Sequence, residues 1–133
     1  RVRDAAEYEV ALDDAAVVLD YDHNAPDKAH LEKTHLPLYL TFRAANPSVP
    51  VLFLTKPDPE RDKEALQRKR VIRDTYLYAR EHGDENVFFI DGYSLFGKAD
   101  RENCTVDGTH PNDLGFYRMA KAVMKIIAPL LKS

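Results

Sequence analysis

The chain has 133 residues, a length typical of one domain with a hydrophobic core of its own. Its 19 lysine and arginine residues against 22 aspartate and glutamate residues give a net charge of −3, and without a basic cluster a nucleic-acid partner is not expected. A single cysteine, Cys104, excludes an internal disulfide and a cysteine-based metal cluster. The apolar runs are far shorter than the roughly 20 residues of a membrane span.

Three apolar runs predict the strands of a sheet: Ala15–Asp20, Val49–Thr55 and Val87–Ile90. The first two runs are continuous rather than alternating, which is typical of strands buried on both faces. Each run is followed by a polar loop. These loops are DYDHN after the first run, KPDP after the second, and residues 91–110 after the third.

The segments between the runs carry a helical pattern. The predicted helices are Arg3–Asp13, Asp27–Asn46, Glu60–His82 and a final helix that Asn112 caps. Pro37 predicts a kink or the start of a second helical segment, and Gly83 predicts a helix end. The apolar face of the third helix comprises Leu66, Val71, Ile72, Tyr76 and Ala79, and that of the last helix comprises Phe116, Ala120, Val123, Ile127 and Leu130.

Strands separated by helices of this length predict parallel strands, right-handed crossovers, and helices on both faces of the sheet. We therefore expect a single α/β domain. Ligand sites of such sheets lie outside the carboxyl ends of the strands, where the three polar loops would meet.

Two of these loops resemble conserved blocks of the SGNH, or GDSL-type, hydrolases. DGTHPNDLGF (Asp107–Phe116) resembles their last block, and VLDYDHN resembles the third block, in which Asn24 matches the oxyanion asparagine. Asp22 stands where that family usually has glycine, and Ala25 where it often has aspartate. With FFIDGYSLFG and the last helix, the resemblance covers essentially the whole chain. It implies a three-layer α/β/α, flavodoxin-like SGNH hydrolase fold with a parallel sheet.

The resemblance also implies catalytic roles. His110 would be the base that activates a serine, Asp107 would orient the imidazole, and Asn24 would donate to the oxyanion. A tight turn can place an aspartate and a histidine three residues apart on one side. The implied protein is a serine esterase for small-molecule or carbohydrate esters that needs no metal and no cofactor.

The nucleophile itself has no match in the sequence. The Gly-Asp-Ser turn and the block with an oxyanion glycine are absent, and Ser48, Ser94 and Ser133 do not follow a strand in such a turn. We therefore expect residues 1–133 to be the C-terminal part of a single SGNH hydrolase-like domain, inactive alone, with its serine upstream of Arg1. The compartment is left open: RVRDAAEYEV is too charged to be a signal peptide, so a signal for secretion or periplasmic export, if the protein has one, would also lie upstream.

A sheet that lacks its first strands would have an open edge. Such an edge favours association with a second copy of the chain or with the missing segment. An alternative function is a non-catalytic α/β interaction module, or a degenerate family member, in which the loop from Asp107 to His110 is only a polar turn and Asn24 only a turn residue.

Other polar side chains have plainer interpretations. Three histidines and two aspartates suggest a metal site: His23, His30, His35, Asp20 and Asp22. The stretch Asp27–His35 is charged throughout, however, and this favours a solvated helix face. Cys104 lies six residues before His110, a spacing that favours a loop cysteine over a thiol nucleophile.

Overall fold

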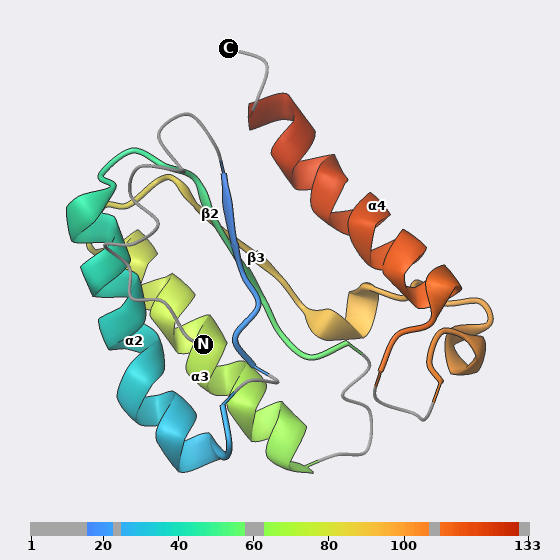
Figure 1. The fold of residues 1–133 in the computed structure, drawn as a ribbon. Helices are drawn as coiled ribbons and strands as arrows, with labels where there is room; N and C mark the ends of the chain where they lie inside the picture. Colours follow the sequence, from blue (N-terminus) through green and yellow to red (C-terminus); the bar gives the residue numbers. More distant parts are fainter. Residues whose placement is uncertain (1–15, 23–24, 58–62, 107–109, 131–133) are drawn as a thin grey trace.

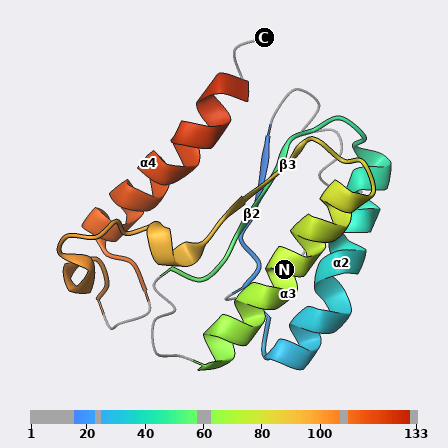
Figure 2. The same cartoon turned by 180° about the vertical axis from the view of Figure 1, so that it is seen from behind.

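The computed structural model describes residues 16–22, 25–57, 63–106 and 110–130. Its three strands, β1 (Val17–Leu19), β2 (Val51–Leu54) and β3 (Val87–Ile90), form a parallel sheet in the order β1-β2-β3. The helices α2 (Lys28–Ala45) and α3 (Lys63–Glu81) cover one face (Figure 1). Figure 2 shows α4 (Asp113–Leu130) on the other face. This α/β/α arrangement confirms the predicted fold class.

The predicted elements agree with the structure in most respects. The bounds of β3 are those predicted, and α2 continues through Pro37 as one helix, so a division into two segments is wrong. Gly83, with a φ of 88°, ends α3 by donating its amide to the carbonyl of Arg80. The predicted helix Arg3–Asp13 lies outside the described residues. Within the described part of the chain, no helix is both long enough and apolar enough to cross a membrane.

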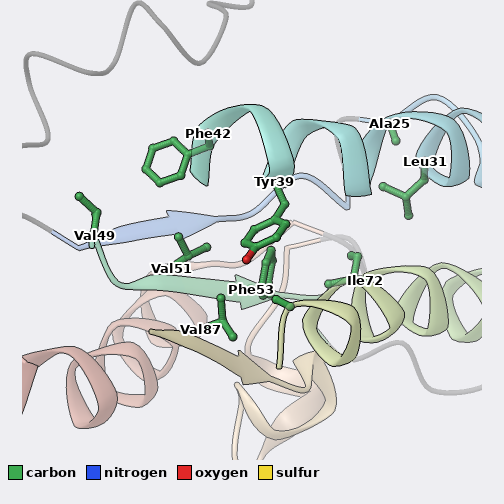
Figure 3. Close-up of a cluster of buried hydrophobic side chains, with 10 residues drawn as sticks. Ala25, Leu31, Tyr39, Phe42, Val49, Val51, Phe53, Ile72 and Val87 are labelled. Atoms are coloured by element: carbon green, nitrogen blue, oxygen red, sulfur yellow. The ribbon is translucent and has the colours of Figure 1, made fainter. Parts of the chain in front are cut away.

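Two hydrophobic clusters hold the layers together, one on each face of β2. Val51 and Phe53 point toward α2 and α3, where Figure 3 shows Tyr39 and Ile72 packed around Phe53. The alternate residues Leu52 and Leu54 belong to the cluster under α4; its other buried members are Ile90, Leu95 and Ile127. All four residues of β2 are buried, as predicted for a strand covered on both faces.

The prediction of burial on both faces is wrong for β1. Among the described strands β1 pairs only with β2, and Val18 is 38% exposed. Val17 and Leu19 pack on the α2 and α3 side, whereas Val18 belongs to neither hydrophobic cluster. The cluster under α4 is built mainly on β2 and β3, and this leaves Val18 at the rim of the sheet.

The predicted solvated face of residues 27–35 holds for the charged residues, such as Glu32 and Lys33, but is wrong for His35. His35 is 1% exposed, and its Nδ1 lies 2.8 Å from the hydroxyl oxygen of Thr75 on α3. Its ring centroid lies 5.5 Å from that of Phe53. A histidine that pairs with a threonine on the neighbouring helix can be buried in an otherwise apolar interface, because one ring nitrogen is satisfied there.

Two large residues of the predicted apolar helix faces are on the surface, and Ala120 is exposed as well. Leu66 is 40% exposed, and the neighbouring Ala65 is buried in its place. Phe116 is 58% exposed near the start of α4. Both residues fit the helical period, but only contact with another layer decides which part of an apolar stripe is buried.

Candidate active site at the carboxyl end of the sheet

The carboxyl ends of the three strands are joined by bonds from side chains to backbone. The buried carboxylate of Asp22, just after β1, accepts the amide of Lys56 through Oδ2 at 2.8 Å. Thr55, just after β2, accepts the amide of Gly92 through its hydroxyl oxygen at 2.6 Å. These bonds hold the loops after β1, β2 and β3 in fixed relative positions at the edge where parallel α/β sheets place their sites.

Gly92 is required by this close approach. A Cβ built on Gly92 would lie 1.9 Å from the carbonyl oxygen of Lys56 and 2.6 Å from that of Thr55. No side chain fits at these separations, so the glycine allows the loop after β3 to lie against the end of β2.

Two neighbouring side chains of α3 bind the same edge. Arg68 donates through both Nη atoms to the carbonyl of Ala25, at 3.0 and 2.7 Å, and its Nε lies 3.4 Å from Asp22 Oδ1. Lys69 pairs with the carboxylate of Asp91 at 2.9 Å, just after β3. The oxyanion candidate Asn24 lies outside the described residues, between the positions of Asp22 and Ala25, which Arg68 contacts.

His110 is exposed in the segment between β3 and α4. The amide of Val106 donates to the carbonyl of His110 at 2.8 Å, and Thr105 pairs with Pro111 in an antiparallel bridge. These bonds fix the chain on both sides of positions 107–109. Asp107, the predicted orienting acid, lies outside the described residues.

Asn112 fixes the same segment from the side of α4. Its Oδ1 accepts the amide of Gly115 at 3.0 Å, which confirms the predicted helix cap. Its own amide donates to the carbonyl of Cys104 at 2.9 Å, and its Nδ2 donates to the carbonyl of Asn103 at 2.6 Å. The sequence indicated the cap, but not that the same side chain holds the segment of His110 against the residues that precede it.

The serines and the cysteine have other contacts. Ser94, in the short 3-10 helix Gly92–Ser94, donates its hydroxyl to the carbonyl of Asp91 at 2.8 Å. Ser48 precedes β2 at the amino end of the sheet, as predicted, and Ser133 lies outside the described residues. Cys104 is buried, and its Sγ lies 3.5 Å from the carbonyl oxygen of Asp100, as expected of a structural loop cysteine.

The histidines considered for a metal site also have partners. His30 Nε2 lies 3.0 Å from the hydroxyl of Tyr21, and His35 bonds Thr75. Across residues 16–22, 25–57, 63–106 and 110–130, no group of three or more histidine, cysteine or acidic side chains is placed to hold a metal ion. His23 lies outside these ranges.

Comparisons with known proteins place these observations in a family context. A sequence model described as the GDSL-like lipase/acylhydrolase family matches residues 4–128. A crystal structure described as that of a GDSL-like lipase from Bacteroides ovatus ATCC 8483 is similar with a TM-score of 0.71 and 26% identity, over 97% of this chain and 40% of that chain. A search of curated proteins gives no match.

A second solved structure shows the same fold. It is that of SsfX3, a salicylyl-acyltransferase from a tetracycline biosynthetic pathway, with a TM-score of 0.70 and 17% identity over 95% of this chain and 41% of that chain. The present chain thus spans about two fifths of the length of each of these two proteins.

Proposed function

Because the chain belongs to the GDSL-like lipase/acylhydrolase family, we propose that it is part of a serine esterase in which His110 is the general base. Asp107 orients the imidazole of His110, and Asn24 donates to the oxyanion. Residues 1–133 form the C-terminal part of the catalytic domain, and the nucleophilic serine belongs to a segment outside them. No metal or cofactor takes part. The substrates are esters of small molecules or carbohydrates.

The observation that carries this proposal is the setting of His110. Its side chain is exposed, and the backbone on both sides of the preceding turn is hydrogen-bonded. A general base must reach the proton that it takes while keeping a fixed position, and an exposed imidazole on a tethered segment meets both requirements. The segment lies within the residues that match the family model.

The proposed reaction follows from the chemistry of these groups. A serine hydroxyl is a weak nucleophile near pH 7, so the neutral imidazole of His110 takes its proton as the oxygen attacks the ester carbonyl. His110 returns this proton to the departing alcohol, and a water molecule then hydrolyses the acyl-enzyme with the same base. The amide of Asn24 stabilises the negative oxygen of each tetrahedral intermediate, a contribution of about 3 kcal/mol for one such donor.

A non-catalytic interaction module remains the second candidate. The positions of the two described serines favour it, because neither is placed as a nucleophile: Ser94 donates its hydroxyl to a backbone carbonyl, and Ser48 lies at the amino end of the sheet. The two candidates differ in whether a protein that contains this chain forms an acyl-enzyme.

The test compares two proteins, the isolated chain and the product of the whole reading frame that contains it. We expect the isolated chain to give no burst with nitrophenyl acetate and no label with a fluorophosphonate, because it carries a base without a nucleophile. The longer protein should give both, with the label on a serine outside residues 1–133. In it, His110→Ala should abolish turnover. Comparing nitrophenyl acetate with an acetylated sugar then tests the substrate class.

A matched control is available for His110. His82 is also an exposed histidine, but it follows α3 at the amino end of the sheet, so His82→Ala should retain wild-type turnover. Equal turnover of His110→Ala and wild type would refute the proposal. A label on Ser94 in the isolated chain would show that the nucleophile is misassigned, and an unlabelled longer protein would favour the interaction module.

A further inference from the structure

The loop after β1 is held by one guanidinium on both sides of positions 23 and 24. Arg68 contacts the carboxylate of Asp22 before these positions and the carbonyl of Ala25 after them. Arg68 lies within α3, one helical turn before the fully buried Ile72, so its backbone is held by the packed core. A displacement of Arg68 would therefore remove one contact on each side of positions 23 and 24.

Asp22 needs this arginine because its carboxylate is 1% exposed. A buried carboxylate is costly unless opposite charge and hydrogen-bond donors replace water. Here Oδ1 faces Arg68 Nε, and Oδ2 accepts the amide of Lys56 at the end of β2. The pair thus connects the loop after β1 both to α3 and to the neighbouring strand. Glycine, which the SGNH hydrolases usually have at this position, has no side chain to make these contacts.

We propose that Asp22 and Arg68 are positioning residues, which fix the chain on both sides of the oxyanion donor Asn24 and so support its catalytic role. This inference rests on the proposed function of Asn24. An oxyanion donor is effective only within about 2.7–3.1 Å of the position that the charged oxygen takes, and a displacement of about 1 Å costs roughly 100-fold in rate. Arg68 touches neither substrate nor oxyanion; it acts through the loop.

The chain contains a matched ion pair for comparison. Arg43 and Asp84 are 2.8 Å apart, both side chains are 14% exposed, and Arg43 also donates to the backbone carbonyls of Asn46 and Val49. This pair lies at the amino end of the sheet, near the residues that enter β2 and β3. Arg43→Gln and Arg68→Gln therefore remove similar interactions from opposite ends of the fold.

The first measurement uses amide hydrogen exchange in the isolated chain. In Arg68→Gln the amide of Lys56 should exchange at least about 10-fold faster relative to the most protected core amides, because its acceptor Asp22 has lost its counter-charge. Arg43→Gln should leave this relative rate unchanged. Unaltered exchange of Lys56 in Arg68→Gln would overturn the proposal.

The second measurement uses turnover by the longer esterase. Arg68→Gln should lower kcat roughly 10- to 100-fold with KM within about twofold, at a temperature where the variant is folded. Arg43→Gln should retain wild-type kcat. In an Asn24→Ala background, Arg68→Gln should have almost no further effect, since both changes remove the same interaction. A purely structural role would leave the two effects multiplicative.

Two outcomes separate this inference from the proposed function. An active wild type whose kcat is unaffected by Arg68→Gln would overturn the positioning role alone. A wild type that neither turns over esters nor takes a serine label would overturn both.

Discussion

Protonation of His35 should destabilise the fold as the pH falls. The ring is 1% exposed, and Nε2 has no hydrogen-bond partner among the residues that the structure describes. The hydroxyl of Thr75 lies 3.4 Å from the carbonyl oxygen of Val71 and can donate to it, which leaves the hydroxyl oxygen to accept Nδ1–H. Burial lowers the pKa of His35 from 6.5 to about 4, because a charged imidazolium would lack water at this position.

The size of the effect follows from the difference between the pKa of His35 in the folded chain and its pKa in the unfolded chain. Between pH 6.5 and about pH 4 the unfolded chain binds a proton at His35 that the folded chain does not, so the free energy of unfolding decreases as the pH falls. The stability is fully present above pH 6.5 and is lost progressively down to about pH 4. A pKa difference of about 2.5, at 1.36 kcal/mol per pH unit, corresponds to a loss of about 3 kcal/mol.

The assay is urea unfolding followed by circular dichroism from pH 7.5 to pH 4, for wild type and His35→Leu. Carboxylates also titrate in this range, but they contribute to both proteins. The difference in unfolding free energy should therefore shift by about 3 kcal/mol in favour of His35→Leu at the acid end. His82→Leu, which removes an exposed histidine, should keep the wild-type slope. If the free energies of unfolding of wild type and His35→Leu changed with pH in parallel, the reasoning would be refuted.

Three further predictions concern the sheet and its loops. Gly92→Ala should lower the free energy of unfolding, measured in urea, by about 3 kcal/mol, because its Cβ would lie 1.9 Å from the Lys56 carbonyl oxygen. Gly83→Ala is the control and should cost roughly 1 kcal/mol, since only the positive φ is strained there. A loss in Gly92→Ala no larger than that of the control would contradict this prediction. Asn112→Ala should cost about 1–2 kcal/mol in the same assay through loss of the α4 cap, and an unchanged midpoint would exclude that role. The isolated chain should self-associate through β1, the edge strand of the described sheet, and Val18→Lys should make it monomeric in light scattering. A wild-type monomer would disprove the edge contact.

The predicted elements came from patterns that are local in the sequence. Continuous apolar runs such as Val87–Ile90 are typical of parallel strands between helical layers, and the structure places β3 at these residues. Gly83 and Asn112 mark helix ends through backbone conformation and side-chain capping, which depend on a few neighbouring residues. The order of strands and helices could therefore be predicted without tertiary information.

The candidate site was predicted from the sequence only in part. The sequence predicts a site in the loops after the three strands, since the carboxyl ends of parallel strands share one edge. The bonds that join these loops, from Asp22 to Lys56 and from Thr55 to Gly92, connect residues more than 30 positions apart. No periodicity encodes such pairs. From the sequence, Asp22 is a departure from the usual glycine and a candidate metal ligand, and nothing in the sequence indicates Arg68.

The sequence by itself determined the α/β alternation, the helix ends and the resemblance of the loops around Asn24 and His110 to known hydrolases. Only the tertiary structure decided which polar side chains are buried and which apolar ones are exposed. His35 is buried because Thr75, 40 residues later on the neighbouring helix, satisfies its ring nitrogen, and Val18 is exposed because β1 is at the edge of the described sheet. Burial depends on contacts between layers. These contacts join residues that are far apart in the sequence, so a local sequence pattern does not predict them.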